Sequence, residues 1–598
     1  MATTSLPRAA TRGGSFLVDA CLPEDVFTPA DLTDDQKLIG RTAEEFVRNE
    51  VVPLIADLEQ HKPDLLAQLL KKAGEIGLLG GGVPEEYGGA GLDKVSSVQL
   101  AENLSAYASF GVSHGGHAGI GTLPIVFFGT EEQKKKYLPL LATGEKLAAY
   151  CLSEPQAGSD AQNSRTRAVL SPDGRSWILN GQKMWITNGG FADVYIVFAK
   201  VDGEKFSCFI VERGFPGFSS GAEEKKMGLK GSSTTALFFE NCRVPKENLL
   251  HEVGRGHIVA FNILNAGRFS LGAYCTGGAK RTLEAASKYA KERTAFGKPI
   301  GDFGLIRAKL AEMAIRIFAV ESMIYRSAGL MDRAISASGD GDKSQQSMKV
   351  FEEYAIESSI SKVFGSELLD FVVDEAVQIF GGYGFHEDYP VARAYRDSRV
   401  NRIFEGTNEI NRMLIVQMLL KRATSGTLPL LQAGAKLREE ILAGPLFDDA
   451  PTGAWAEEER ILTGVKKTFL LVAGAALEKH RDRLAEQQEI VAELSDIVME
   501  CYAIESSLRR VQKSEAARGQ GSSAVMADAA RVVLHDAADR VETGARRALA
   551  AVLEGDMLRT QLTVLRRFLK REPADTIAMR QRISAAIQAG DRYPFESR

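Results

Sequence analysis

Three segments of the chain combine small residues, hydrogen-bond donors and an aromatic side chain, which packing alone does not require. They are residues 150–168, 183–190 and 378–410. In the first, Gly158 lets the backbone approach a ligand closely. The hydroxyls of Ser153 and Ser159, with nearby N–H groups, can donate to anionic or carbonyl oxygens. These groups favour a ligand that carries phosphate or carbonyl oxygens.

The second and third segments add a flat ring, a hydroxyl and a carboxylate. In KMWITNGG, Trp185 offers a flat surface and Thr187 a hydroxyl group. The third segment is punctuated by glycines at 381, 382 and 384, and it carries Glu405 within FEGT. Taken one at a time, each segment also has an ordinary structural interpretation, because a Gly-rich loop is commonly a turn and a Glu before Gly a solvated helix end.

The familiar nucleotide motifs do not occur in this sequence. Neither GxGxxG after a strand nor GxxxxGK[ST] is present, so any nucleotide must be held in another way. Residues 217–221, GFSSG, match GxSxG, but a nucleophile elbow needs a strand, a sharp turn and a helix. The polar, glycine-broken sequence that follows favours a surface hairpin loop over a hydrolase.

Two histidines raise the question of a metal site. His114 and His117 lie among Gly115, Gly116 and Gly119, with no carboxylate or further histidine in a ligand pattern. A tight helix contact or a pocket wall is therefore favoured, and we predict no bound metal.

The elements that must position these segments follow an α, β, α, α order. Residues 34–60 show helical spacing interrupted by Pro53, and helical periodicity returns from about residue 257 to the end. Between about residues 148 and 259, β-branched and aromatic runs alternate with turn pairs, which predicts a small antiparallel domain. The pairs Asp173-Gly174, Asn180-Gly181 and Asp202-Gly203 are expected to mark hairpins. We divide the chain into residues 1–147, 148–258, 259–424 and 425–598.

Composition limits the class of protein. The 598 residues are 44% hydrophobic and 25% charged, with a net charge of -5, which does not favour nucleic acid or anionic lipid as a partner. Six scattered cysteines without a CxxC pair fit a reducing compartment. No apolar stretch is long enough to span a bilayer. Residues 1–16 exclude a secretory signal and leave a short organellar presequence open, with a cytoplasmic protein as the default.

Together, in this order and spacing, the segments resemble the acyl-CoA dehydrogenase family. The resemblance runs from about residue 33 to 420 and includes EEQKKKYLPLLATGE, VPKENLL and ERTAFGKPI. The N-terminal GGSFLVDACLPEDVFTPADLT and the helical extension after residue 428 resemble the very-long-chain branch. The resemblance implies a mostly α fold: a helical N-terminal domain, an antiparallel β-barrel-like middle domain, a four-helix-bundle core and an extra C-terminal helical domain.

The resemblance also implies an FAD site shared between two subunits of a homodimer. Around the flavin ring and pyrophosphate it places Tyr150, Leu152, Ser153, Gly158, Ser159, Trp185 and Thr187, with the Thr187 hydroxyl near flavin N5. For the ADP half of the neighbouring subunit's FAD it implies Arg293, Phe296, Gln378 and Gly382, with Thr407 and Glu409 at the adenosine end. For the substrate it implies Ser159, Gly115, Gly116, Asn265, Arg268 and Gly406.

The implied reaction is the first step of fatty-acid β-oxidation, in which a saturated acyl-CoA becomes a trans-2-enoyl-CoA. Glu405 would take the α-proton while the β-hydrogen leaves as hydride to flavin N5. The Glu405 N–H and an FAD ribityl hydroxyl would polarise the thioester oxygen. Burial should raise the pKa of Glu405 and make it a stronger base. Electron-transfer flavoprotein is the implied electron acceptor.

At three positions this chain differs from some or many of the relatives it resembles. Some relatives place the base where this chain has Gly267, which cannot serve, so Glu405 is the expected base. Gly304 stands where many relatives have a glutamine that contacts adenine, and Gln156 replaces a residue that is often small.

Small residues at Gly115, Gly116 and Gly119 predict room for long acyl chains, although glycines there could instead serve close helix packing. An acyl-CoA oxidase and an assembly or DNA-associated relative are competing interpretations of the same resemblance.

The segment 428–446 could form a helix that packs on the protein with Leu428, Leu431 and Ile441 buried, or it could attach to a membrane surface. If the source is eukaryotic, the mitochondrial matrix is the expected location.

Overall fold

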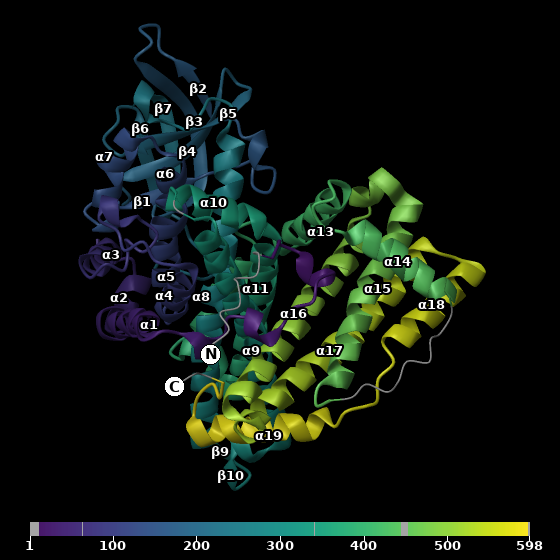
Figure 1. The fold of residues 1–598 in the computed structure, drawn as a ribbon. Coiled ribbons are helices and arrows are strands. Elements are labelled where there is room, and N and C mark those ends of the chain that lie inside the picture. The colour runs from purple at the N-terminus through teal and green to yellow at the C-terminus, as the bar shows by residue number, and fades with distance from the viewer. Residues whose placement is uncertain (1–10, 63, 340, 444–452, 596–598) are drawn as a thin grey trace, which may run out of the picture.

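The computed structural model describes residues 11–62, 64–339, 341–443 and 453–595. It consists of a β-sheet flanked by an N-terminal group of helices, a bundle of long helices beneath them, and further helices packed beside the bundle (Figure 1). The mostly helical fold with a β middle domain and an extra C-terminal helical domain is therefore confirmed. The segment 444–446 of the predicted membrane-binding stretch and residues 1–10 of the predicted presequence lie outside the described residues.

The N-terminal helices form their own small core around Phe46, Leu70, Leu104 and Phe110. The predicted helix over residues 34–60 is divided because Pro53 cannot donate a helical hydrogen bond. It becomes α1, a π-helical turn over Val47–Val51 and the short α2. The helices are α1 (Asp34–Phe46), α2 (Ile55–Glu59), α3 (Leu65–Glu75), α4 (Lys94–Leu104), α5 (Ala108–His114), α6 (Leu123–Phe128) and α7 (Glu131–Ala142).

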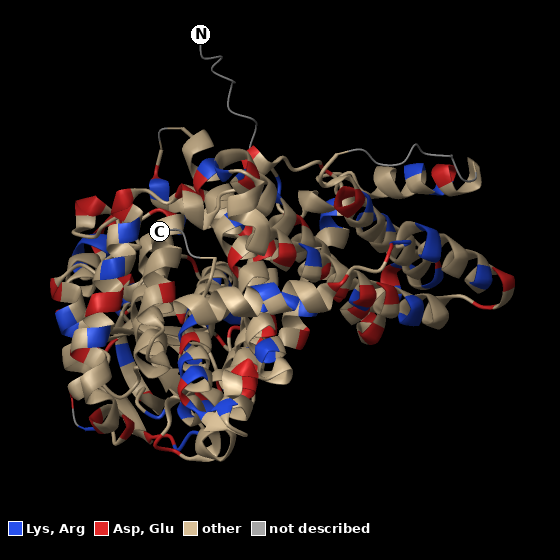
Figure 2. Ribbon diagram, turned by 90° about the horizontal axis from the view of Figure 1, so that it is seen from below, with Lys and Arg blue, Asp and Glu red and all other residues tan. Residues whose placement is uncertain are grey.

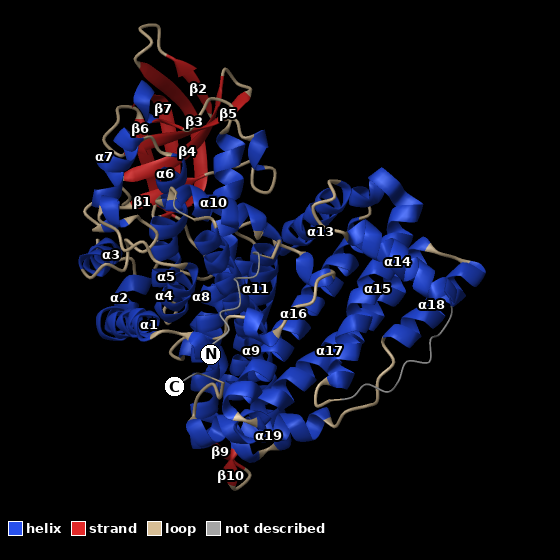
Figure 3. Ribbon diagram, viewed as in Figure 1, coloured by secondary structure: helices blue, strands red, loops and turns tan. Residues whose placement is uncertain are grey.

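The middle domain is one twisted sheet in the order β6-β7-β3-β2-β4-β5-β8, with β1 beside β4 (Figure 3). Its strands are β1 (Ala148–Cys151), β2 (Arg167–Leu170), β3 (Ser176–Thr187), β4 (Val194–Val201), β5 (Lys205–Glu212), β6 (Phe218–Glu223), β7 (Thr234–Pro245) and β8 (Leu249–Leu250). Buried aromatic side chains including Trp177, Tyr195 and Phe209 form its core.

The predicted antiparallel, barrel-like domain differs from this sheet in two respects. The sheet is open, because β6 and β8 end its path without pairing with each other. It is also mixed, because β1 and β2 both run parallel to β4. The Asn180-Gly181 hairpin was wrong as well, since this pair lies inside β3 at a register shift against β7. The Asp202-Gly203 turn, with φ of 54° and 80°, does join β4 to β5.

Four long helices form the bundle: α8 (Gly256–Glu292), α9 (Gly304–Ala337), α11 (Ala355–Phe380) and α13 (Asn408–Thr424). Smaller elements connect them, namely β9 (Thr294–Ala295), β10 (Lys298–Pro299), α10 (Lys343–Glu353) and α12 (Pro390–Ser398). The sheet contacts the start of α8 through β5, and α4 packs along α8 as far as Gly277. A large cavity lies between the sheet, the N-terminal helices and α8.

The C-terminal helices pack along α9 and α13 through α16, with α19 closing on α9 at the far end (Figure 1). They are α14 (Leu430–Ala443), α15 (Ala456–His480), α16 (Gln488–Arg518), α17 (Gln520–Val552), α18 (Gly555–Phe568) and α19 (Thr576–Gly590). One continuous hydrophobic core joins them to the bundle. Of the residues expected to bury in the segment 428–446, Leu428 is buried, but Leu431 is 53% exposed.

Lysine and arginine alternate with aspartate and glutamate along the helices (Figure 2). Many of these charges pair with each other, for example Arg540 with Glu500 and Arg582 with Asp528. Within the part of the chain that the structure describes, no helix is both long and apolar enough to cross a bilayer.

Candidate active site

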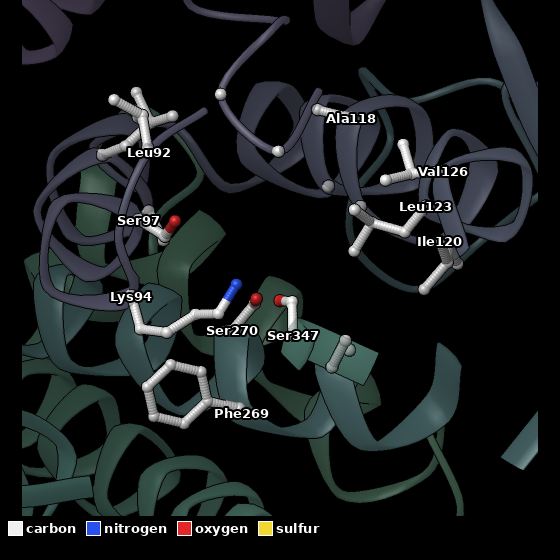
Figure 4. Close-up of a pocket in the computed structure, with 18 of the residues that line it drawn as sticks. Leu92, Lys94, Ser97, Ala118, Ile120, Leu123, Val126, Phe269, Ser270 and Ser347 are labelled. Carbon is white, nitrogen blue, oxygen red and sulfur yellow. The ribbon is translucent and has the colours of Figure 1, made fainter. Parts of the chain in front are cut away.

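A cavity of about 1180 Å³ lies between the N-terminal helices, the bundle and the edge of the sheet (Figure 4). Glu405, Gly267 and Thr187 line it, and so do Gly115, Gly116 and Gly119. Apolar side chains such as Leu123, Val126 and Phe269 make up much of its wall. The segments 183–190 and 378–410, which the sequence singles out, therefore meet at one cavity.

Glu405 projects into the cavity from the loop between α12 and α13. Its backbone adopts a left-handed conformation, with φ of 58°, and Gly406 follows with φ of 80°. Two such residues in sequence turn the chain sharply, and a non-glycine residue accepts this strain only where the surroundings enforce it. The Glu405 N–H has no hydrogen-bond partner in the described part of the chain.

The Glu405 carboxylate occupies the space left by Gly267 on α8. A Cβ atom at Gly267 would lie 2.7 Å from Oε2 and 2.9 Å from Cδ of Glu405. Any larger residue at position 267 would therefore collide with the carboxylate. The structure explains why a glycine here accompanies a glutamate at position 405.

Burial raises the pKa of Glu405 to about 7, although Arg268 and Lys362 oppose this effect. Its Oε2 atom is buried and has no hydrogen-bond partner in the described part of the protein. A desolvated carboxylate without donors is a stronger base than the same group in water. At neutral pH the group can therefore both accept and release a proton.

Arg268 and its neighbours hold the loop that carries Glu405. The Arg268 Nε donates to the Glu405 carbonyl at 3.1 Å, and its Nη1 donates to Asn265 Oδ1 at 2.9 Å. The side-chain amide of Asn411 donates to the Gly406 carbonyl at 2.9 Å. These bonds link the loop to α8 and α13. Arg268 and Asn265 thus position the loop, whatever further contact they make with a ligand.

Lys362 and Asn408 are two site residues that the sequence analysis missed. Lys362 is fully buried on α11 and donates to Asn408 Oδ1 at 2.5 Å. The Asn408 Nδ2 donates to Ser366 Oγ and to Glu367 Oε1, each at 3.0 Å. Burial lowers the pKa of Lys362 to about 8, with Cys275 and Glu405 opposing. A lysine within a helix has no distinctive sequence signal, so only the fold reveals this contact.

The first and second segments are fastened together by a buried ion pair. Lys183 on β3 lies 2.6 Å from Glu154, and both side chains are almost inaccessible. The Glu154 carboxylate also accepts from the amides of Arg165 and Thr166. Lys183 donates to the Leu152 carbonyl as well. The pair fixes the strand end at Leu152 and Ser153 beside β3.

These two segments present groups that fit a flat, polar ring. The Tyr150 hydroxyl is buried without a hydrogen-bond partner in the described part of the chain. Trp185 stands 62% exposed at a left-handed φ of 56°, and Thr187 lines the cavity two residues later. Gly158 and Ser159 are exposed on the loop after β1, and a Cβ at Gly158 would meet nothing within 4 Å. An unpartnered hydroxyl, an uncovered indole and an open glycine loop suit the implied flavin and its phosphates.

The residues expected at the ADP half lie together but far from Glu405. Arg293 stacks over Tyr383, with 5.5 Å from its guanidinium carbon to the ring centroid. Phe296 is 96% exposed on the β9–β10 hairpin, and Gln378 and Gly382 are exposed at the end of α11. Gly267 and Arg293 are 26 residues apart on α8 and its end, or about 39 Å at 1.5 Å per residue. The residues expected at the ADP half thus lie well apart from the Gly267–Glu405 contact along α8.

Thr407 and Glu409 begin α13 beside the Glu405 loop. The Thr407 hydroxyl caps the helix by accepting from the Ile410 N–H at 3.3 Å, while Glu409 is exposed. Thr407 thus has a structural role that the chain itself explains.

The histidines have structural explanations. His114 bonds the Tyr274 hydroxyl and the Leu78 carbonyl through its two ring nitrogens. His117 does the same with the Ala148 N–H and the Leu141 carbonyl. Burial lowers the pKa of each to about 4. Among the described residues no group of three or more His, Cys, Asp or Glu could hold a metal ion.

The GxSxG match at residues 217–221 also has a structural explanation. These residues run into the edge strand β6, which pairs with β7. No helix follows this strand before β7, so the match is not a nucleophile elbow.

A helix–sheet–helix fold with a buried carboxylate facing a large cavity, and an exposed indole and an open glycine loop beside it, fits the class of flavin-dependent dehydrogenases. Family models for the N-terminal, middle and C-terminal domains of acyl-CoA dehydrogenase match residues 33–145, 149–242 and 254–420. A further acyl-CoA dehydrogenase C-terminal model matches residues 464–567. The chain belongs to the acyl-CoA dehydrogenase family, and its cofactor is FAD.

Individual relatives cover nearly the whole chain. A probable acyl-CoA dehydrogenase of Bacillus subtilis is 48% identical over 97% of this chain and 98% of its own length. The human mitochondrial very long-chain specific acyl-CoA dehydrogenase is 38% identical over 74% of this chain and 69% of its own. A crystal structure of an acyl-CoA dehydrogenase complexed with FAD from Bacillus anthracis superposes with a TM-score of 0.95, at 49% identity, over 98% of this chain and 100% of that one.

Proposed function

We propose that this protein converts long-chain saturated acyl-CoA to trans-2-enoyl-CoA, with Glu405 as the base that removes the α-proton. The observation that supports this most directly is the Glu405 carboxylate, which faces the cavity with one oxygen buried and unpartnered in the described structure. Its pKa near 7 suits a group that must take a proton and later release it.

The chain's own residues account for the acid–base part of the reaction. Glu405 takes the α-proton of the acyl group, and its free backbone N–H is placed to donate to the thioester oxygen as negative charge develops there. Arg268 holds the Glu405 carbonyl, which keeps the loop in its left-handed turn. FAD, when bound, supplies the acceptor for the β-hydrogen, which leaves as hydride.

For the flavin ring and pyrophosphate we propose Tyr150, Leu152, Ser153, Gly158, Ser159, Trp185 and Thr187 as the binding residues. Tyr150 and Trp185 offer an unpartnered hydroxyl and an uncovered ring, which supports this set. Thr407 and Glu409 complete it at the adenosine end. For the substrate we propose Gly115, Gly116, Asn265, Arg268 and Gly406 with Ser159. We divide the chain at residues 148, 259 and 425.

We propose that two copies of this chain form the catalytic unit. Arg293 lies at the far end of α8 from the Gly267–Glu405 contact, and Phe296 is almost fully exposed, which supports contacts of this group, with Gln378 and Gly382, to the FAD of a second copy. In a dimer, a second copy of the chain would cover these residues, and they would contact the FAD that it holds. Sedimentation of the holoprotein should show a dimer, and Phe296→Ser should weaken it and lower the FAD content.

The cavity volume supports a long acyl chain, because ligand pockets commonly enclose about 300–1,000 Å³ and this one exceeds that range. A Cβ at Gly119 would meet nothing within 4 Å, so this glycine leaves open space rather than a packing contact. Gly115 and Gly116, in contrast, lie against Tyr274 and Thr187.

As the electron acceptor we propose an electron-transfer flavoprotein, since the relatives from Bacillus subtilis and human are dehydrogenases. Rapid reoxidation of the product complex by air would instead indicate an oxidase.

Peripheral membrane attachment through α14 is supported by its exposed Leu431 and Leu442, and flotation with liposomes tests it. A cytoplasmic location, or the mitochondrial matrix in a eukaryote, goes with this function.

Anaerobic titration of the yellow holoprotein with saturated acyl-CoAs of increasing length tests the reaction. Flavin bleaching should be strongest with long chains, and Glu405→Gln should slow it by roughly 10²- to 10⁴-fold. The exposed Glu352, changed to Gln, is the matched control and should bleach normally. Normal bleaching by Glu405→Gln would overturn the base assignment, and a maximum at short chains would overturn the chain length.

A further inference from the structure

The cavity that contains Glu405 also contains a lysine whose ammonium group meets no carboxylate in the described structure. Lys94, the first residue of α4, lines the cavity and extends its side chain across it (Figure 4). Its Nζ lies 4.9 Å from the centroid of the Phe351 ring. In the described part of the chain this Nζ forms no ion pair and donates no hydrogen bond. The cation–π contact holds the ammonium in place but leaves its three donors unused.

The two nearest carboxylates are engaged with backbone amides instead. Asp332 accepts from the Lys94 N–H at 2.7 Å and from the Val95 N–H at 3.0 Å, one with each oxygen. Asp93 accepts from the Ser96 N–H at 2.6 Å and from the Gln36 side chain at 3.0 Å. Both carboxylates thus cap the start of α4. They balance the local charge without meeting the lysine headgroup.

Two hydroxyl groups face the same place. Ser347 on α10 is only 7% exposed, and its Oγ is buried with no hydrogen-bond partner in the described structure. Ser270 on α8 also lines the cavity. Figure 4 shows the ends of Lys94, Ser270 and Ser347 pointing toward one another from three helices. A buried hydroxyl without a partner carries an energetic cost that a ligand oxygen would remove.

We propose that Lys94, Ser270 and Ser347 form a subsite for a carboxylate on the distal part of the acyl chain, so that ω-carboxyacyl-CoA thioesters are substrates. This inference rests on the proposed function, because it assigns the chain end of the same substrate. A carboxylate could accept from the ammonium and from both hydroxyls, which are all donors.

Burial is the main influence on the pKa of both Glu405 and Lys94, but their charged neighbours differ. Those of Glu405 are Arg268 and Lys362, and those of Lys94 are Asp332 and Asp93. Burial lowers the pKa of Lys94, and a bound anion would restore its charged form.

A plain hydrocarbon chain would be a poorer occupant of this part of the cavity. Covering an ammonium with methylene groups removes water without supplying an acceptor, which is unfavourable. The other arrangement is that the alkyl chain passes to one side and the ammonium keeps its water. These two arrangements predict different substrate preferences.

The test compares mono-CoA esters of dicarboxylic acids, from adipic to hexadecanedioic acid, with plain acyl-CoAs of equal length. The readout is the ratio of their kcat/KM values for anaerobic flavin reduction by the holoenzyme. Lys94→Met should lower the ratio by roughly 10- to 100-fold at the preferred length, because a hydrogen bond to a charged group is lost. Ser347→Ala should lower it several-fold, and Lys94→Arg should retain most of it. Lys71→Met, at an exposed lysine of α3, should leave it unchanged.

A second readout does not depend on turnover. In the Glu405→Gln background, calorimetry gives the dissociation constants of both thioester types, and Lys94→Met should weaken only the ω-carboxy type. If neither type reduces the flavin, the proposed function fails while the binding comparison still decides the subsite. If plain acyl-CoAs react and the ratio is the same with and without Lys94, the subsite is overturned. Should Lys94→Met fold poorly, Ser347→Ala decides the question: a several-fold lower ratio supports the subsite, and an unchanged ratio overturns it.

Discussion

In the proposed reaction, the ionisation of a single residue, Glu405, governs the chemistry of the site. The chain keeps this carboxylate away from hydrogen-bond donors and presses it against Gly267, so its neutral form is favoured more than in water. Two cations, Arg268 and Lys362, keep the pKa from rising further. The balance places the group at the midpoint of its titration near neutral pH.

The pH dependence of catalysis follows from this balance. Proton abstraction needs the carboxylate, so kcat/KM should rise with pH through about 7, the pKa of Glu405. A kcat/KM profile that is flat from about pH 5.5 to 8.5 would contradict the base assignment.

The contribution of Glu405 to the free energy of unfolding should fall as the pH rises, whereas kcat/KM should increase. Because folding raises the pKa from 4.5, the stability that the neutral carboxyl contributes is present below 4.5 and lost as the pH rises through about 7. Glu405→Gln should therefore gain stability over the wild type at about pH 8, on the order of 1 to 3 kcal/mol, and little at about pH 4. Thermal unfolding at both values measures this.

Lys362 should act on the base through charge and through the loop. Lys362→Met removes a nearby cation and the bond to Asn408, so the pKa of Glu405 should rise further and the loop should loosen. We expect the acid limb of the kcat/KM profile to move to higher pH, with about a tenfold loss of rate at neutral pH. A purely structural role would lower the rate without moving the limb. The exposed Lys421, changed to Met on α13, is the control, and Lys362→Arg should restore part of the profile.

Among the secondary-structure elements, the end of β1 must stay close to β3, because the two segments proposed to bind the flavin follow β1 and end β3. These strands are not neighbours in the sheet order, so the Glu154–Lys183 pair, together with the bond from the Met184 N–H to the Ser153 carbonyl, connects the two segments. The pair is buried and satisfied by backbone groups on both sides. Buried pairs of this kind are costly to break from one side.

Lys183→Met should therefore destabilise the protein by about 3 to 5 kcal/mol, since it leaves the Glu154 charge buried. It should also lower FAD retention, because the Leu152 carbonyl loses its Lys183 donor and only the bond from the Met184 N–H to the Ser153 carbonyl still ties this segment to β3. The free energy of unfolding and the flavin-to-protein absorbance ratio measure the two effects. Glu154→Gln added to Lys183→Met should recover part of the stability, and Lys205→Met at an exposed pair should change little. Full FAD retention by Lys183→Met would contradict the proposed anchor.

Across the whole molecule, the C-terminal helices are joined to the bundle by buried charges as well as by the shared core. The Oε2 atom of Glu321 on α9 forms an ion pair with Nη1 of Arg510 on α16 at 2.6 Å. It also accepts a hydrogen bond from the Tyr593 hydroxyl at 2.8 Å. Burial alone would raise the pKa of Glu321, but Arg510 and Lys280 hold it below its usual value. The extension therefore behaves as part of the same folded unit.

Arg510→Met should cost about 3 kcal/mol or more at neutral pH, because the Glu321 charge loses a buried partner. The paired carboxylate stabilises the protein above its unfolded pKa, and this contribution disappears as the pH falls through the lower folded value. The difference between variant and wild type should thus shrink at acidic pH. Urea unfolding at two pH values measures it, with Arg546→Met on the exposed face of α17 as the control. An equal loss at both pH values would contradict the charge mechanism.

Local sequence information was sufficient for the family and the α, β, α, α order, and it named Glu405 as the candidate base. Helical and strand periodicities indicate the order of the elements, and the three segments indicate the family through their order and spacing. Glu405 could be named because its loop is continuous in sequence, and Gly267 because it is the other position for a base. The hairpin at Asn180-Gly181 failed because the same pair also suits a bulge within a strand.

Which groups meet one another could be learned from the folded chain alone. Lys362, Glu154, Lys183 and Lys94 look like ordinary charged residues in the sequence, since nothing local distinguishes a buried lysine from a solvated one. The partners of Lys183 and Lys362 lie 29 and 46 residues away along the chain. The open, mixed form of the sheet likewise depends on pairing between β1 and β4, which no local turn specifies. Burial and long-range pairing arise from the packing of whole elements, and this packing set the charge around Glu405 and left the Lys94 ammonium facing the cavity.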